Sequence, residues 1–282
     1  MLTDEYLKTL KKSIKGKNNY LFLINDSNNE LKQHFDPDYK NKFNKDIFLK
    51  QLNEKKNYCA AKNIQYFFFL VPDKSLVCKQ FLPFVPDYEK RNYNMINDFL
   101  PDFIDYLDYT CYFLNDSHIN YEGGKKLAYH YLKYIDPNFN RHIFRKLVDD
   151  QIVSVDLEHK GDLLLEDNWS YSLDEKNDFL NNEVIFSNKY LELLNDCIPE
   201  NFKQSIRETV YYKNQKSFKD LKVLIFRDSA MLFLKDVLSI YFKEILLYWG
   251  YWSFNKDLIE WYKPDIILEI KTERFLENHE FF

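Results

Sequence analysis

The sequence predicts an α/β protein whose mostly parallel β-sheet is covered by helices on both faces. Short apolar runs rich in β-branched and aromatic residues alternate with stretches in which apolar residues recur at helical spacing. Most of the runs are too continuous for a strand with one solvated face, which is typical of strands buried on both sides. The alternation of such strands with helices favours parallel pairing.

The expected elements follow from these two patterns in chain order. Continuous apolar runs predict strands at residues 20–24, 64–71, 110–114, 222–226, 245–248 and 265–270. Helical periodicity predicts helices at residues 46–62, 124–135, 231–242 and 255–262.

The 282 residues are enough for one large domain or two small ones. The sequence has no internal repeat, no low-complexity block and no Gly/Ser linker, so we expect a single domain over residues 1–282. The region from about 138 to 219 is polar, helix-leaning and punctuated by Gly161 and Pro199. We interpret this region as an insertion suited to a lid or a substrate wall.

Composition argues against several classes of partner. The net charge is −5 and the acidic and basic residues are interleaved, so the chain lacks the basic stripe of a nucleic-acid binder. The four cysteines show no CxxC pair, which argues against a zinc site and a disulfide framework and predicts free thiols. No metal site is expected, because the histidines and cysteines lack ligand spacing.

The amino-terminal residues 1–17 are charged and predict an amphipathic helix, without the apolar core of a signal peptide. The longest apolar stretches, 66–71 and 223–226, fall far short of the roughly 20 residues that span a bilayer. The chain as written is therefore expected to be cytoplasmic and without a membrane span. If the chain is part of a longer precursor, association with the cell envelope is the alternative.

Ser229 follows a predicted buried strand. Ligands of open parallel sheets gather outside the carboxyl ends of the strands. The strand at 222–226 runs into Arg227 and Asp228, and a predicted helix begins just after Ser229. This position exposes the hydroxyl and aims the first backbone N–H groups of the helix at a developing oxyanion. The same spacing also fits a serine that only caps the helix.

A second strand end carries Asp116 and His118. A histidine two residues after an aspartate can receive a hydrogen bond from that carboxylate at one ring nitrogen and take a proton from serine at the other. The alternative is an aspartate that caps the turn beside a surface histidine. The remaining histidines have no comparable setting and are interpreted as surface or packing residues: His34, His130, His142, His159 and His279.

Arg274 follows the third informative strand end, at 265–270. Its guanidinium could hold a carboxylate or a sugar hydroxyl at the rim of the site. Pairing with Glu273 or Glu277 on the surface is the alternative, because such ion pairs are common.

The order of these motifs is distinctive, because the D-x-H sequence precedes the serine. Short motifs occur in this order: Gly16 to Phe22 (GKNNYLF), Phe69 to Lys74 (FLVPDK), Asp116-Ser117-His118, Gly124 to Ala128 (GKKLA), Gly161-Asp162-Leu163, Asp228-Ser229, Lys263-Pro264-Asp265 and Glu273-Arg274. In these motifs the chain resembles the SGNH-hydrolase-like domain of the alginate O-acetyltransferase family, the AlgX and AlgJ type. Ordinary SGNH hydrolases place the serine first. The resemblance covers nearly the whole chain.

The resemblance implies a three-layer α/β/α sandwich with Ser229 as nucleophile, His118 as base and Asp116 orienting the imidazole. It also implies O-acetyl transfer to a polysaccharide in envelope or capsule assembly. Two positions depart from the family pattern. Arg227 replaces the glycine of G-D-S and could touch an anionic donor or acceptor. Ile119 replaces the aromatic residue that follows D-T-H and leaves one wall of the acceptor site open to question.

The expected mechanism is a two-step exchange through an acyl-enzyme on Ser229. The backbone N–H of Ser229 and a side-chain amide would hold the oxyanion, with Asn214 as the candidate amide and a turn residue as its alternative. The same residues with water as acceptor would make a carbohydrate esterase or deacetylase. A non-catalytic glycan-binding module is the alternative from another class.

The acetyl donor is not specified by any motif. The chain has neither a P-loop nor a G-x-G-x-x-G sequence, so a bound nucleotide cofactor has no support. Acetyl-CoA is a reasonable co-substrate for a cytoplasmic enzyme. The sequence leaves the cofactor-binding residues and the oligomeric state unspecified.

Overall fold

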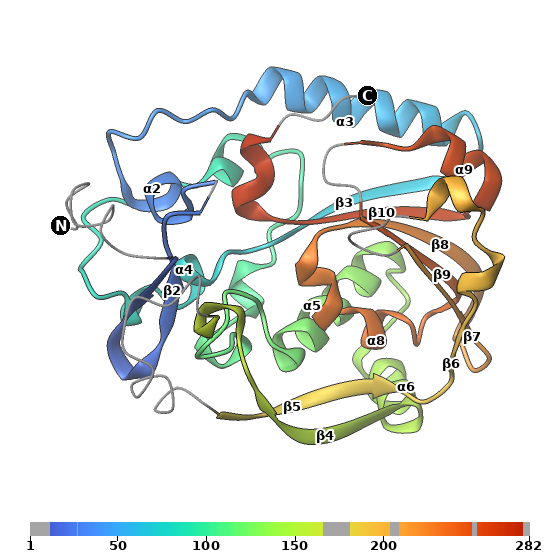
Figure 1. Cartoon of the computed structure of the whole chain (residues 1–282). Coiled ribbons are helices and arrows are strands. Elements are labelled where there is room, and N and C mark those ends of the chain that lie inside the picture. Colours follow the sequence, from blue (N-terminus) through green and yellow to red (C-terminus); the bar gives the residue numbers. More distant parts are fainter. Residues whose placement is uncertain (1–11, 27, 166–180, 204–208, 250–252, 279–282) are drawn as a thin grey trace.

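The structure, a computed structural model, describes residues 12–26, 28–165, 181–203, 209–249 and 253–278 (Figure 1). Its strands are β1 Ser13–Lys15, β2 Leu21–Leu23, β3 Gln65–Val71, β4 Ile152–His159, β5 Asn181–Asn188, β6 Leu191–Leu193, β7 Val210–Asn214, β8 Lys219–Arg227, β9 Phe242–Trp249 and β10 Ile266–Thr272. Its α-helices are α2 Glu30–Phe35, α3 Lys45–Ala60, α4 Lys74–Val77, α5 Tyr121–Ile135, α6 Arg141–Gln151, α8 Lys235–Leu238 and α9 Lys256–Tyr262.

The central sheet has six strands in the order β3-β10-β8-β9-β7-β6. The four strands β3, β10, β8 and β9 run parallel to one another. The strand β7 pairs antiparallel with β9, and β6 pairs antiparallel with β7. The prediction of a mostly parallel sheet is therefore confirmed, with an antiparallel addition at one edge.

Helices cover both faces of this sheet. On one face, α3 and α9 pack against apolar side chains of β8, β9 and β10, among them Leu224 and Ile267. On the other face, α5 and α8 pack against the alternate residues of the same strands, among them Ile225 and Leu268. Figure 1 shows α3 lying along one side of the sheet, with α5 and α8 on the other. The three-layer α/β/α sandwich is confirmed.

Four predicted strands, at 64–71, 222–226, 245–248 and 265–270, correspond to β3, β8, β9 and β10. The strand at 20–24 corresponds to β2, which pairs with β1 outside the central sheet. The strand predicted at 110–114 is wrong. A 3-10 turn, Tyr109–Cys111, begins this segment, and one isolated bridge joins Tyr112 to Ile119. Phe113 of this segment is buried against the rings of Tyr121, His159 and Phe233.

Helices predicted at 46–62, 124–135 and 255–262 correspond to α3, α5 and α9. The helix at 231–242 is interrupted. A 3-10 helix, Ser229–Phe233, precedes the short α8, and β9 already begins at Phe242. Most of the amino-terminal helix predicted at 1–17 lies outside the described residues, and its end is the strand β1.

The region from 138 to 219 contains more strand than the sequence indicated. After α6, the strands β4 and β5 form an antiparallel pair, and β6 and β7 join the central sheet. Its role as a lid or substrate wall stays a prediction. The four cysteines are free thiols, as expected. Among the helices that the structure describes, none is long and apolar enough to cross a bilayer.

Candidate active site

Ser229 lies just beyond the carboxyl end of β8, at the first position of the 3-10 helix Ser229–Phe233. Asp228 is the residue that caps this helix, because its Oδ1 accepts from the backbone N–H of Ala230 at 2.9 Å. Its Oδ2 accepts from the N–H of Thr272 at 2.6 Å, which ties the turn to the end of β10. The capping role that the sequence also allowed for Ser229 belongs to Asp228, and the serine hydroxyl is left for other contacts.

His118 lies between Ser229 and Asp116. Its Nε2 is 2.6 Å from Ser229 Oγ, and its Nδ1 is 2.6 Å from Asp116 Oδ1. The side chain of His118 is 16% exposed. These distances are those of hydrogen bonds in which Asp116 accepts from Nδ1–H and Nε2 accepts from the serine hydroxyl. The structure thus brings together the three residues that the sequence separated by up to 113 positions.

The carboxylate of Asp116 accepts four hydrogen bonds. Oδ1 accepts from Nδ1 and the backbone N–H of His118, the latter at 2.9 Å. Oδ2 accepts from Nε2 of His159 at 3.1 Å and from the N–H of Asp162 at 3.0 Å. Because both oxygens are held from two directions, the plane of the carboxylate is fixed relative to the His118 ring.

Lys74 holds the loop that carries Asp116. It follows β3 at the start of α4 and is almost fully buried. Its Nζ donates to the carbonyl of Leu114 at 3.0 Å and to the carbonyl of Asp116 at 2.9 Å. On the other side of His118, Asn120 caps α5 by accepting from the N–H of Gly123. The loop between Leu114 and Asn120 is thus anchored at both ends.

Burial and hydrogen bonding shift the pKa values of these groups. Burial disfavours the imidazolium, but the hydrogen bond and charge of Asp116 outweigh burial and raise the pKa of His118 above its ordinary value. Burial would raise the pKa of Asp116, yet the hydrogen bonds from His118 and His159 hold it well below its usual range. Burial lowers the pKa of Lys74 to about 8. Asp116 is therefore ionised where His118 begins to lose its proton.

A metal ion would compete with this arrangement. Asp116, His118 and Asp162 offer possible ligand atoms within 4.8 Å of one another. Both ring nitrogens of His118 are already used, by Asp116 and by Ser229. A cation at Nδ1 would displace the hydrogen bond to Asp116. The geometry therefore fits proton transfer between serine and histidine.

Several solved structures share the fold of this chain, and one of them is named as an O-acetyltransferase domain. PatB1 of Bacillus cereus is 13% identical, with a TM-score of 0.59 over 94% of this chain and 97% of that chain. The O-acetyltransferase domain of Pseudomonas putida AlgJ is 12% identical, with a TM-score of 0.56 over 96% of this chain and 94% of that chain. The chain has the AlgJ-type fold.

AlgX of Pseudomonas aeruginosa is 11% identical, with a TM-score of 0.52 over 98% of this chain and 68% of that chain. A second PatB1 structure carries a sulfonyl adduct. No protein-family model and no curated protein sequence matches the chain. The likeness therefore lies in the AlgJ-type fold, at sequence identities too low to carry residue roles.

Within this AlgJ-type fold, Arg274 lies in a different place from either expectation. It is buried, and its Nη1 donates to Asp73 Oδ1 and to Glu30 Oε2 at 2.5 and 3.1 Å. Glu273 instead binds Arg91. Both the surface pair and the contact at the site rim are therefore wrong. Arg274 belongs to a buried ionic cluster with Asp73 and Glu30.

Asn214 does not reach Ser229. It ends β7, which runs antiparallel to β9, so it lies at the opposite edge of the sheet from the end of β8. Its side-chain amide donates to Gln151 and to the carbonyl of Ser239, both at 2.8 Å. The prediction that Asn214 supplies an oxyanion donor is wrong, because both amide hydrogens are used elsewhere.

Arg227 is buried rather than presented to solvent. Its guanidinium carbon is 4.9 Å from the ring centroid of Trp249, at the end of β9, and its Nη1 is 3.4 Å from the carbonyl of Asp228. These contacts brace the turn before Ser229. The structure gives no support to a contact between Arg227 and an anionic substrate.

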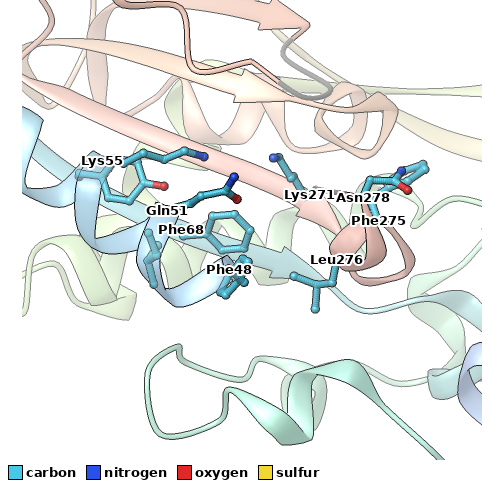
Figure 2. A pocket seen from close by; sticks show the side chains of 10 residues that line it. Phe48, Gln51, Lys55, Phe68, Lys271, Phe275, Leu276 and Asn278 are labelled. Atoms are coloured by element: carbon cyan, nitrogen blue, oxygen red, sulfur yellow. The ribbon is translucent and has the colours of Figure 1, made fainter. Parts of the chain in front are cut away.

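A small pocket on the α3 face of the sheet is too small to be the substrate site. Figure 2 shows a mixed lining, in which polar side chains from α3, β10 and the segment after it stand beside aromatic and aliphatic ones: Gln51, Lys55, Lys271 and Asn278 with Phe48, Phe68, Phe275 and Leu276. Its volume is about 20 Å³, which holds about one water molecule. Lys55 lies 2.8 Å from Glu269 within the wall. This pocket is a structural feature of the sandwich.

The sequence missed three residues of the site. His159 was interpreted as a surface or packing residue, yet it donates to Asp116. Lys74 and Asp162 entered only as parts of the VPDK and GDL motifs, and the structure shows both beside Asp116. The motif order was the available signal for Lys74 and Asp162. His159 ends β4 and carries no local signature that separates it from a surface histidine.

Proposed function

We propose that the chain is a serine-dependent O-acetyltransferase that transfers an acetyl group to a hydroxyl of a glycan. The observation that carries this proposal is the chain of hydrogen bonds Asp116–His118–Ser229 at a strand end of an AlgJ-type fold. Low identity limits the comparisons to the fold, so the chemistry rests on this geometry. The name of the AlgJ domain, and the motif order described above, support acetyl as the group and a polysaccharide as the acceptor.

In the first step, His118 Nε2 takes the proton of Ser229 as Oγ attacks the acetyl carbonyl carbon. The Oγ–C bond forms and the bond to the donor's leaving group breaks. The proton held by His118 then passes to that leaving group, so the acetyl-enzyme is neutral and His118 is again a base. The raised pKa of His118 helps it to hold this proton transiently.

In the second step, a glycan hydroxyl gives its proton to His118 Nε2 and attacks the acetyl-enzyme. The ester bond to Ser229 breaks, and the proton returns to Ser229 Oγ. We assign the backbone N–H of Ser229 as an oxyanion donor in both steps, because it is the first N–H of the helix that begins at this residue. The donor is proposed to be an acetyl ester or thioester, with acetyl-CoA as the reagent to try first.

Covalent labelling tests the nucleophile without a known substrate. A sulfonyl fluoride forms an Oγ–S bond to an activated serine and releases fluoride, and intact mass reports the adduct. We expect one adduct per chain on Ser229, none in Ser229→Ala, and normal labelling in the control Ser154→Ala, whose residue is exposed on β4. Labelling of Ser229→Ala at the wild-type rate would overturn the assignment.

Product analysis separates transfer from hydrolysis. The protein is incubated with acetyl-CoA or an aryl acetate and a panel of glycans, and acetate is measured free and as sugar ester. Sugar ester that depends on Ser229 supports the transferase. Free acetate alone, unchanged by any acceptor, would favour the esterase that uses the same three residues.

A further inference from the structure

His159 holds the side of Asp116 that faces away from His118. Its Nε2 lies 3.1 Å from Asp116 Oδ2, and its side chain is 18% exposed. The ring stacks on Phe113 with a centroid distance of 4.1 Å and an interplanar angle of 15°. The carbonyl of His159 also accepts from the side-chain amide of Asn115 at 2.8 Å. The imidazole is thus fixed by stacking on one side and by the Asp116 loop on the other.

The segment from His159 to Asp162 packs directly on the loop that carries Asp116. A Cβ added to Gly161 would lie 2.0 Å from the carbonyl oxygen of Asn115, so only glycine allows this approach. The approach brings the N–H of Asp162 to Asp116 Oδ2 at 3.0 Å. His159 Nε2 and this N–H therefore reach the same carboxylate oxygen from one segment, while Oδ1 is left to His118.

We propose that His159 is a positioning residue of the acetyl-transfer site, whose Nε2–H holds Asp116 so that its Oδ1 receives the Nδ1–H of His118. This inference rests on the proposed function. His159 touches neither Ser229 nor the reacting atoms, so it acts only through Asp116. The site is then a hydrogen-bonded array of four side chains, His159, Asp116, His118 and Ser229, with one imidazole at each oxygen of the carboxylate.

The proposal has a consequence for the pH dependence of the reaction. A donor at Oδ2 draws negative charge away from Oδ1, so losing it strengthens the pull of Asp116 on the His118 proton. The acid limb, which is the low-pH range where the rate falls because His118 is protonated, then moves to higher pH. Other charged groups that face the array are common to all variants: Asp162, Lys74, Glu183 and Arg274.

Two polar substitutions of His159 separate its hydrogen bond to Asp116 from its packing on Phe113. The side-chain nitrogen of Gln reaches about as far as histidine Nε2, whereas that of Asn reaches only the place of Nδ1. We therefore compare His159→Gln with His159→Asn, using His142→Gln on the exposed start of α6 as control. The probe is a sulfonyl fluoride, and its maximal labelling rate, half-saturating concentration and pH dependence are measured on the full chain.

We expect His159→Asn to lower the maximal labelling rate roughly 10-fold, as for loss of one hydrogen bond to a charged group. Its half-saturating probe concentration should stay unchanged and its acid limb should move to higher pH. His159→Gln should stay within about 3-fold of the wild type, because it restores the donor. A melting temperature within a few degrees of the wild type in both variants excludes a general folding defect.

Three results overturn the inference, and they can be distinguished from one another. If wild-type Ser229 labels and His118→Ala labels slowly, but both His159 variants match the wild type in rate and acid limb, positioning by His159 is wrong and the proposed function stands. If His159→Gln and His159→Asn lose the same activity, the donor at Nε2 is not what matters. If Ser229 does not label at all, the proposed function fails and the inference falls with it.

Discussion

Replacing Asp116 with Asn removes one charge from the site without changing the number of side-chain heavy atoms. The carboxylate accepts four hydrogen bonds, two at each oxygen. In asparagine, an NH2 group replaces one of the two carboxylate oxygens. Wherever it lies, this NH2 group points its hydrogens at N–H groups that themselves donate hydrogen bonds. If it faces His118 Nδ1, it favours the tautomer with the hydrogen on Nε2, which cannot accept the proton of Ser229.

The size of the effect follows from the charge that is lost. With charge centres about 4 Å apart and an effective dielectric constant of about 20, the carboxylate stabilises the imidazolium by about 4 kcal/mol. That energy corresponds to about 1000-fold in rate. The His118 side chain is only 16% exposed, so solvent screens this interaction weakly. We therefore expect Asp116→Asn to label with a sulfonyl fluoride about 1000-fold more slowly.

The pH dependence gives a second, independent readout. Asp116 raises the pKa of His118 against the opposing effect of burial. When the charge is removed and burial remains, this pKa falls, so the residual labelling of Asp116→Asn should keep its rate to lower pH than the wild type. Intact mass measured from pH 5 to 9, with Asp150→Asn on exposed α6 as control, gives both quantities. A wild-type rate, or an acid limb displaced upward, would refute the assigned role of Asp116.

Three further substitutions test the frame around the site. Lys74→Met removes the Nζ donor from the carbonyls of Leu114 and Asp116. The carbonyl of Leu114 keeps the N–H of Leu21 as a donor, so the cost falls on the buried carbonyl of Asp116, at about 1–3 kcal/mol. The variant should lower both labelling and the free energy of unfolding in urea. Burial raises the pKa of Glu30 to about 7, so the free energy that Glu30 contributes to folding falls as the pH rises from 4.5 to 7. In Glu30→Gln, the free energy of unfolding should therefore vary less with pH over this range, by at most about 3 kcal/mol. Gly124→Ala places a Cβ 2.0 Å from the carbonyl oxygen of Phe233, and should lower labelling and melting temperature despite alanine's helix propensity; higher values would contradict this contact.

The sequence predicted the fold where the physical signal is local. The strands β3, β8 and β10 each contain a continuous apolar run, because both faces of the sheet are covered. The same signal failed at 110–114, where Phe113 is fully buried without a strand partner on either side. Burial makes a run apolar whether or not the backbone joins a sheet, so composition alone could not separate the two cases.

The site was predictable in part. The order of Asp116, His118 and Ser229 indicated the central array, and the strand-end position was correct for Ser229 but not for the D-x-H motif. The prediction for Asn214 failed because a short apolar run does not reveal the direction of its strand in the sheet. The strand β7 runs antiparallel to β9, so its carboxyl end lies at the opposite end of the sheet from Ser229. Arg274 failed because its partner Asp73 lies 201 positions away. Pairing over that distance depends on the folded chain.

Different parts of the chain place the serine and the histidine of the site. Ser229 is placed by β8, and its turn is tied to β10 through Asp228 and Thr272. The loop of His118 is not a strand end of the sheet; Lys74, at the end of β3, holds it by two hydrogen bonds to backbone carbonyls. Every residue has a backbone carbonyl, so this anchor requires no particular side chain in the loop that Lys74 binds. The position of His118 therefore depends on a buried lysine that lies 42 positions before Asp116 in the sequence.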